Sequence, residues 1–184
     1  PVGFAFYQPA PELSAWYKQE KALKKQEVPT KQRPPKPPPN PHYPTKQALA
    51  LRLLAQFKAE HPIFKVHCIT ADALYGTATF VDGAAALFGG VQVISPIRSN
   101  QKIRVQKRDQ HVADYFATHP GTPQKIRIRG GEEVGAMVGS ARLYVCSHHT
   151  KRFIVAIKYE EEEAYRYLMA SDLTWRTLDI VQGH

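Results

Sequence analysis

Long apolar runs are missing from this sequence. No stretch approaches the roughly 20 apolar residues that a membrane-spanning helix requires, and no secretory leader is recognisable. We therefore expect no membrane partner. Only two cysteines occur, Cys68 and Cys146, each within an apolar, strand-like run. Because no CxxC or close HxxxH spacing accompanies them, we expect two buried, reduced thiols rather than a cysteine-based metal site.

Common nucleotide-binding and hydrolase signatures are also absent. The sequence has no GxxxxGK[ST] or GxGxxG loop and no nucleophile elbow, and GGVQVIS at 89–95 supplies only two of the glycines that a phosphate loop needs. Acidic residues are scarce as well, with 16 against 25 lysines and arginines, for a net charge of +9. This charge suits an anionic partner such as nucleic acid, although a soluble basic surface gives the same composition.

The 184 residues suit one domain with room for an inserted subdomain, and 43% apolar residues are enough for a core. The pattern predicts a strand at 1–8 and an exposed helix at 12–26. Eight prolines between residues 29 and 44 exclude a helix or a central strand there. We expect an extended surface connector, with a basic arm on DNA or a ligand for an aromatic groove as alternatives.

The next part of the chain has the alternation typical of an α/β layer. The expected elements are a helix at 46–60, a strand at 64–70, a helix at 77–88 and a strand at 91–97. Thr45 and Thr77 can cap the two helices, and Leu49, Leu53 and Phe57 recur at the spacing of one buried helix face. Strand, helix and strand in this order predict parallel crossovers.

Beyond residue 100 the pattern predicts a largely antiparallel, β-rich block at about 124–170, preceded by a short helix at 111–119. Turns are expected at Gly130–Gly131, at Gly139–Ser140 and at 147–151. The last turn contains His148 and His149, which we expect on the surface. The four glutamates at 160–163 could form a carboxylate cluster, but a solvated hairpin turn is the simpler interpretation.

A helix is expected at the end of the chain. Asp172 is suited to be its N-cap, and Trp175 and Leu178 would then face a core. Because the chain starts without Met and stops within this expected helix, we expect a fragment of a longer protein.

Asp72 is the first candidate site residue. It follows the apolar run FKVHCIT at the point where a parallel strand should end, and ligands gather at this edge of open α/β sheets. A carboxylate there is a hard oxygen donor suited to Mg²⁺ or Mn²⁺. One aspartate alone binds such ions poorly, and aspartate also favours turns and helix caps, so a structural role remains open.

The densest basic stretch, SPIRSNQKIRVQKR at 95–108, follows the last predicted parallel strand. Arginine and lysine neutralise phosphates, while serine and asparagine add hydrogen bonds to them. Polar and apolar residues partly alternate here, so the solvated face of a strand is an equal alternative. The candidate DNA-binding residues are Arg98, Ser99, Asn100, Lys102, Arg104, Lys107 and Arg108.

ADALYG followed by a helix and VQVISPIRSNQKI, together with FAFYQPAP and YRYLMASDLTWRTLDIVQ, resembles the cut-and-paste insertion-sequence transposases of the DDE type. The resemblance implies an RNase H-like α/β fold with a mixed sheet, flanking helices and a β-rich insertion. Residues 1–100 would be a partial catalytic core, with the Pro-rich connector at 29–44. The insertion would span 101–170, and 171–184 would begin the helix that carries a catalytic glutamate.

The family holds two Mg²⁺ or Mn²⁺ ions with two aspartates and one glutamate. Asp72 matches the second aspartate, as catalytic residue and metal ligand, while the other two acids would lie before Pro1 and after His184. The resemblance implies an enzyme that cleaves DNA and transfers its strands, acting on transposon ends and target DNA. It also implies a homodimer in the synaptic complex and a bacterial, cytoplasmic, nucleoid-associated location. The fragment alone is expected to be inactive.

Two other interpretations remain open. The chain could be a non-catalytic nucleic-acid-binding or decayed protein with the same layer. It could also belong to a different metal-dependent nuclease, because RNase H-like layers carry several phosphodiester chemistries.

Overall fold

The computed structural model describes residues 3–127 and 131–183. The chain divides into two compact units, Pro1–Phe57 and Lys58–His184, which we describe separately. Within the described residues, no helix combines the length and the apolar character that crossing a bilayer requires.

The N-terminal unit begins with an extended segment instead of the predicted strand. Residues 3–8 pair with no strand in the described structure, and residues 1 and 2 lie outside it. Phe4 and Phe6 are 76% and 88% exposed and contact each other edge to face. The prediction of a strand was wrong here because the apolar pattern has no neighbouring strand to pair with. Lys46 lies over the ring of Tyr7, 5.1 Å from its centroid.

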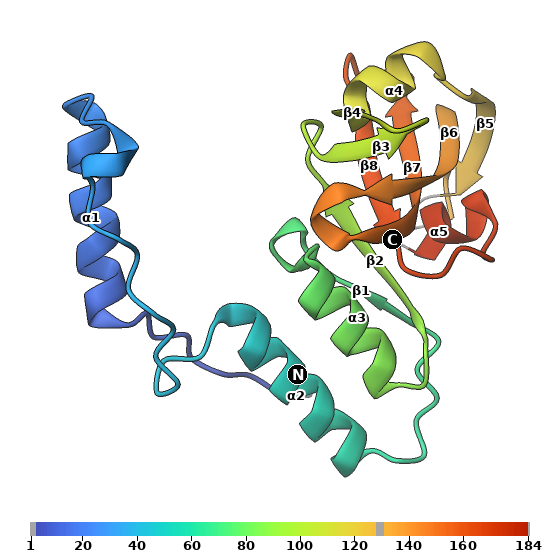
Figure 1. Ribbon diagram of the computed structural model, residues 1–184. Coiled ribbons are helices and arrows are strands. Elements are labelled where there is room, and N and C mark those ends of the chain that lie inside the picture. Colours follow the sequence, from blue (N-terminus) through green and yellow to red (C-terminus); the bar gives the residue numbers. More distant parts are fainter. Residues whose placement is uncertain (1–2, 128–130, 184) are drawn as a thin grey trace. The chain divides into compact units, whose positions relative to one another are not determined.

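The predicted helix at 12–26 is confirmed as α1 (Pro11–Lys25), and the Pro-rich segment after it runs back along this helix (Figure 1). The indole nitrogen of Trp16 donates a hydrogen bond to the carbonyl of Pro34 at 2.9 Å. Arg33 donates to the carbonyl of Val28 at 2.8 Å and to the carboxylate of Glu20 at 3.0 Å. The segment contains one short 3-10 turn, η1 (Thr30–Gln32), and is otherwise without helix or strand.

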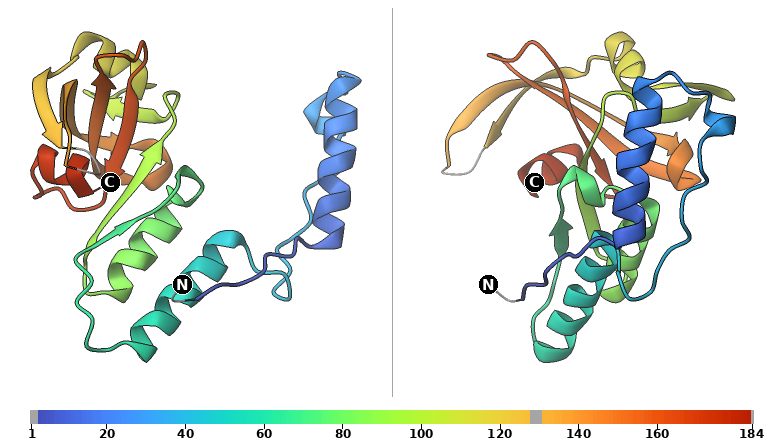
Figure 2. Two further views of the ribbon diagram at one scale, coloured as in Figure 1. Left: turned by 180° about the vertical axis from the view of Figure 1, so that it is seen from behind. Right: turned by 90° about the vertical axis from the view of Figure 1, so that its left-hand side faces the viewer.

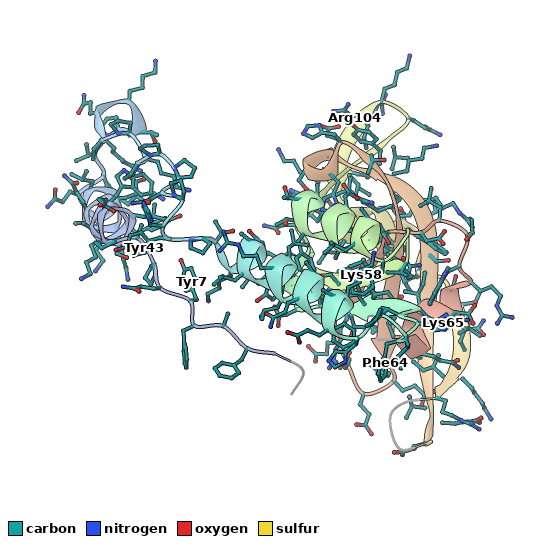
Figure 3. All side chains as sticks on the ribbon, turned by 90° about the horizontal axis from the view of Figure 1, so that it is seen from below. Tyr7, Tyr43, Lys58, Phe64, Lys65 and Arg104 are labelled. Atoms are coloured by element: carbon teal, nitrogen blue, oxygen red, sulfur yellow. The ribbon has the colours of Figure 1, made fainter. Side chains whose placement is uncertain are left out.

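The predicted helix at 46–60 is confirmed as α2 (Lys46–Glu60), which begins in the first unit and ends in the second. Thr45 caps it, since its hydroxyl accepts from the backbone N–H of Ala48 at 3.1 Å. The predicted apolar face is only half-buried. In the second unit, Lys58 donates to the carbonyl of Leu87 at 2.6 Å, beyond which the next helix ends (Figure 3).

The described strands of the second unit form one sheet in the order β1-β2-β8-β7-β6-β3-β4, with β5 paired to β6. Only β1 and β2 are parallel, and the other pairs are antiparallel. In Figure 2 the long β6–β7 ribbon is strongly curved. The strands are β1 (Cys68–Thr70), β2 (Gln92–Ile97), β3 (Lys102–Val105), β4 (Arg108–His111), β5 (Thr122–Arg127), β6 (Glu133–Val145), β7 (Thr150–Tyr159) and β8 (Arg166–Ala170).

The parallel crossover predicted for residues 64–97 is confirmed, although its first strand shrinks to the three residues of β1. The chain passes from β1 through η2 (Ala73–Tyr75) and α3 (Ala78–Leu87) to β2. Thr77 caps α3 by accepting from the N–H of Phe80, and Gly89 and Gly90 close it with left-handed φ angles of 78° and 91°. These two caps confirm both predicted helix boundaries.

Helices cover both faces of the sheet. Alternate residues of β7 point to opposite faces, so Phe153 and Val155 join a buried cluster with Ile180 of α5 (Thr177–Gly183). On the other face, Phe116 of α4 (Val112–Thr118) contacts the ring of Tyr167 on β8. The second unit is therefore a mixed α/β fold with a mostly antiparallel sheet and flanking helices.

A single strand replaces the turn predicted at Gly139–Ser140. Both residues lie inside β6, which pairs with β7 along its length. A side chain at Gly139 would come within 3.2 Å of the ring of Phe116 and the carbonyl of His119, so the glycine admits α4 to the sheet rather than turning the chain. The turn predicted at Gly130–Gly131 lies partly outside the described residues.

The end of the chain confirms part of the prediction. The glutamates at 160–163 form the turn between β7 and β8, as expected. Asp172 closes a turn by accepting from the N–H of Thr174 at 2.8 Å, and the helix starts only at Thr177, so Asp172 is not its N-cap. Trp175 packs against the core cluster as predicted, whereas Leu178 is exposed.

Gly121 should be the least replaceable of the glycines with positive φ. Its φ is +85°, and an added Cβ would overlap the backbone of Val138 on β6. Gly89, with φ +78°, has open space around it, so alanine there meets backbone strain alone, on the order of 1–3 kcal/mol. We expect Gly121→Ala to lower the urea midpoint clearly more than Gly89→Ala. Equal midpoints would contradict the packing of β5 on β6.

Candidate functional site

Asp72 lies directly after β1, in a loop whose backbone is tied to β2. The N–H of Ala71 donates to the carbonyl of Ile94 at 2.9 Å, and the hydroxyl of Ser95 donates to the carbonyl of Asp72 at 3.1 Å. The carboxylate of Asp72 accepts from the N–H of Leu74 at 3.0 Å and thereby caps η2. The side chain is exposed at the carboxyl end of a parallel strand, as the sequence predicted.

Gly76 closes this loop in close contact with the end of β2. A Cβ at this position would lie 2.9 Å from the hydroxyl oxygen of Ser95 and 3.3 Å from the carbonyl oxygen of Pro96. The loop that carries Asp72 is therefore pressed against the sheet. We refer to residues 71–76 as the Asp72 loop.

A hydrogen-bond chain through two buried side chains supports the Asp72 loop from the other side. Nε2 of His148 lies 3.1 Å from the carbonyl oxygen of Gly76, and Nε of Arg152 donates to Nδ1 of the same ring at 3.1 Å. Nη2 of Arg152 also pairs with a carboxylate oxygen of Asp82 on α3 at 2.5 Å. His148 and Arg152 are only 6% and 5% exposed. The chain connects β7, α3 and the Asp72 loop.

The prediction that both histidines of this turn are on the surface was wrong for His148. The turn is η3 (Cys146–His148), which tucks the ring of His148 under the sheet, while His149 takes a left-handed φ of 52° and stays exposed. The two cysteines are free and half-buried, so burial is less complete than expected. Burial raises the pKa of the Cys68 thiol.

The partners of His148 define its protonation state. A guanidinium can only donate, so Nδ1 must be the acceptor, and the ring proton sits on Nε2 facing the carbonyl of Gly76. Burial lowers the pKa of His148, and the charge of Arg152 lowers it further, while the hydrogen bond to Gly76 and the charge of Asp82 act in the opposite direction without cancelling the shift. His148 is therefore a neutral imidazole in the folded protein.

Asp72 is the only carboxylate that the described structure places in its loop. Asp82 is paired with Arg152, and Asp172 lies by Gln92 at the start of β2, whereas Asp72 contacts Ser95 further along the strand. The glutamates at 160–163 follow the far end of β7 from His148. Among residues 3–127 and 131–183, no three His, Cys, Asp or Glu side chains come together as a metal site. Asp72 alone fits one hard oxygen ligand, not a complete site for two ions.

The seven predicted DNA-binding residues are all exposed, but they do not share one face. Arg98, Ser99 and Asn100 form the connection between β2 and β3. Lys107 sits in the turn of the β3–β4 hairpin with a left-handed φ of 68°. Arg108 pairs with Val105, so it belongs to the sheet face opposite to Lys102 and Arg104.

Lys102 and Arg104 share their face with two residues that the sequence did not single out. Arg104 is opposite Tyr144 on β6, whose own partner on β7 is Lys151. The guanidinium of Arg104 lies 5.5 Å from the centroid of the Tyr144 ring (Figure 3). We call Lys102, Arg104, Tyr144 and Lys151 the basic sheet face. It combines positive charge with an aromatic surface, the two features that contact phosphates and bases.

An ion pair reduces the charge of this face. The cross-strand partner of Arg104 is Asp109, and the two side chains form paired hydrogen bonds of 2.6 and 3.3 Å. The hydrogen bond to Asp109 raises the pKa of Arg104 and lowers that of Asp109 in turn. Arg104 would therefore have to share its guanidinium between Asp109 and a phosphate.

Sequence reasoning missed Asp82, His148 and Arg152. An arginine inside the apolar run RFIVAI was the available signal, because a buried guanidinium needs a carboxylate partner. That partner is 70 residues away, at Asp82. Nothing in the sequence alone identifies it.

The fold and these contacts define a mixed α/β protein with an exposed aspartate at the end of a parallel strand and a basic, aromatic sheet face. No family model matches the chain, and no curated protein matches it either.

The state of His148 predicts a pH dependence of stability. The pKa of His148 is lowered in the folded protein. When the pH falls below the ordinary histidine pKa of about 6.5, the unfolded chain therefore binds the extra proton more readily than the folded chain, and the free energy of unfolding decreases. His148→Gln keeps an N–H for the carbonyl of Gly76 but cannot titrate. We expect its urea midpoint to fall less between neutral and mildly acidic pH than that of the wild type. His149→Gln, one residue away and exposed, should behave like the wild type.

If acidification lowers the urea midpoint of His148→Gln as much as that of the wild type and of His149→Gln, the assignment of His148 as a neutral, buried imidazole is wrong.

Proposed function

We propose that this chain is the central part of the catalytic core of a DNA transposase of the DDE type, with an RNase H-like arrangement of β1, α3 and β2. The parent enzyme would cleave DNA at transposon ends and join it to target DNA, as a homodimer in the bacterial nucleoid region. Asp72 would be one of its three metal-binding carboxylates. In this proposal the other two acids come from outside the residues of this chain.

The placement of Asp72 is the observation that supports the proposal. Its side chain is exposed at the carboxyl end of β1, where ligands of parallel α/β layers gather. Its backbone is tied to Ser95, and its loop is supported by the neutral ring of His148. A catalytic carboxylate needs such a rigid support, because small displacements of a reacting group cost large factors in rate.

Bound Mg²⁺ or Mn²⁺ would supply the activation of a water or a 3′-hydroxyl for attack on a phosphodiester. The carboxylate of Asp72 would contribute a hard oxygen ligand on a fixed loop. Asp82 and Arg152 would keep that loop in place without touching the DNA. The cations of the basic sheet face and of the 98–100 connection would contact phosphates, which gives affinity without reading the sequence.

A binding protein without catalysis is the second candidate. The observation that favours it is the hydrogen bond from the N–H of Leu74 to the carboxylate of Asp72, which is by itself a sufficient reason for an aspartate at this position. Under this alternative the basic surfaces would still bind nucleic acid. The two functions differ in what the negative charge of Asp72 does.

Substitutions at Asp72 separate these two roles. Asparagine retains an oxygen to accept from Leu74 but removes the charge, whereas alanine removes both. We expect Asp72→Asn to abolish DNA cleavage and joining by the parent protein with little change in stability. Asp72→Ala should also lose about 0.5–2 kcal/mol of stability with the cap. The measurements are a Mg²⁺-dependent cleavage and strand-transfer assay and urea unfolding.

Asp172→Asn is the matched control, because Asp172 closes a turn of the same kind through Thr174. It should leave cleavage unchanged. A parent protein that still cuts and joins DNA as Asp72→Asn would refute the role of Asp72. Cleavage by this chain alone, lost in the same variant, would instead refute the proposal that the other acids lie outside it.

The predicted DNA contacts can be tested by the salt dependence of binding. The double variant Arg98→Ala with Lys102→Ala should weaken binding of a DNA duplex and reduce the slope of log affinity against log salt by up to about 2, or roughly 0.9 for each lost phosphate contact. Lys125→Ala with Arg127→Ala removes two exposed charges from β5 as a control. If the first pair leaves affinity and slope unchanged, the predicted contacts are wrong.

A further inference from the structure

The net positive charge is concentrated in the N-terminal unit. Residues 1–57 contain nine lysines and arginines against three glutamates, a formal charge of +6. Residues 58–184 contain sixteen against thirteen acids, a formal charge of +3. Less than a third of the chain therefore carries two thirds of its net charge. The stretch at 95–108 is locally dense in cations, but its unit is close to balanced.

The helix α1 is a fixed part of this unit. The indole of Trp16 is hydrogen-bonded to Pro34, and Arg33 joins the Pro-rich segment to Glu20. Lys24 also pairs with Glu20 at 3.5 Å. The Pro-rich segment is thus a strap along one side of α1. On this side the carboxylate of Glu20 is already paired with Arg33 and Lys24 of the same unit.

The opposite side of α1 is a row of lysines. At 100° per residue, Lys18, Lys21 and Lys25 lie within about 60° of each other and roughly opposite Trp16. All three are exposed. The two acids of the helix, Glu12 and Glu20, point to other sides. We call Lys18, Lys21 and Lys25 the lysine row.

Helix stability explains only part of the lysine row. Cations in the last turn interact favourably with the helix dipole, which accounts for Lys25. Lys18 and Lys21 lie before that turn, and neither has an acid four residues before or after it, at 14, 22, 17 or 25. Three like charges on one side of a two-turn stretch repel one another unless an anion is present, so their arrangement favours an anionic partner.

The dimensions of the lysine row match a nucleic-acid backbone. From residue 18 to residue 25 the helix rises by about 10 Å. Duplex DNA carries about six phosphates over the same length of its axis. A rigid helix of this kind can hold three ammonium groups along a strand at once, because its strap has already fixed the helix in place.

We propose that the lysine row of α1 is a second DNA-binding surface, which contacts the phosphates of duplex DNA without reading its sequence. The DNA is the substrate of the proposed transposase, so the inference rests on that function for the identity of the partner. It does not depend on Asp72 or on metal binding. The Pro-rich segment would then serve as the strap that holds a binding helix, rather than as a simple connector.

The test is a triple substitution in the whole chain, Lys18→Gln, Lys21→Gln and Lys25→Gln. Glutamine removes each charge and keeps a good helix propensity. Binding of a fluorescent DNA duplex of arbitrary sequence is measured by anisotropy between about 50 and 200 mM salt. We expect the salt slope to fall by up to about 3, and affinity at low salt to fall at least tenfold, with an unchanged circular dichroism spectrum.

The matched control is Lys65→Gln, Lys125→Gln and Arg127→Gln, three exposed cations of the second unit that lie outside the basic sheet face. This variant has the same net charge as the triple lysine variant. Equal losses in the two variants would mean that only net charge matters, and they would overturn the proposal. A second experiment measures binding to vesicles that contain phosphatidylserine. If the lysine substitutions abolish vesicle binding but leave DNA affinity unchanged, the lysine row binds a lipid surface and the proposal is wrong.

The two proposals can fail separately. Salt-dependent DNA binding that is unaffected by the lysine substitutions would overturn the lysine row and leave the role of Asp72 standing. Conversely, a parent protein whose cleavage survives Asp72→Asn, but whose DNA affinity falls with the lysine substitutions, would refute the catalytic role and support the DNA-binding surface.

Discussion

The guanidinium of Arg152 is the group on which the arrangement of the second unit depends. It is almost completely buried, and it holds the carboxylate of Asp82 on α3 and the ring of His148 after β6 at the same time. A buried guanidinium depends on its hydrogen-bond partners, and here one of them, the carboxylate of Asp82, is itself 58% exposed to solvent. The contacts of this group connect α3, η3 and β7, and the Asp72 loop is attached to them through Gly76.

This dependence explains how a three-residue strand can position the side chain of Asp72. Among the described strands, β1 pairs with β2 alone, and three paired residues give little stability of their own. The Asp72 loop is instead held from two sides, by Ser95 on the strand and by His148 from below. Both contacts are made to backbone carbonyl oxygens. The carboxylate of Asp72 therefore remains exposed while the backbone that carries it is fixed.

Local signals in the sequence were reliable, and long-range pairings were not visible in it. Caps at Thr45 and Thr77 and a pair of glycines after α3 predicted three helix boundaries, because each acts within four residues of its position. The expected strand at 1–8 and the turn at Gly139–Ser140 failed for a different reason. A strand needs a partner strand, and a glycine within a strand can allow a helix from another part of the chain to pack closely. Neither condition can be predicted from the neighbouring residues.

The same distinction applies to charge. The basic stretch at 98–108 is prominent in the sequence because it has five cations and no acid, yet the structure pairs Arg104 with Asp109 and distributes the others over a connection, a turn and two faces. The lysines of α1 are interleaved with acids in the sequence, and only the helix separates the two. The helix brings Lys18, Lys21 and Lys25 together on one side. On the other side, the Pro-rich strap accepts from Trp16 through Pro34 and pairs with Glu20 through Arg33. A nucleic acid would be attracted by positive charge that no acid compensates, so the proposed binding surfaces follow from the fold and not from the local density of cations in the sequence.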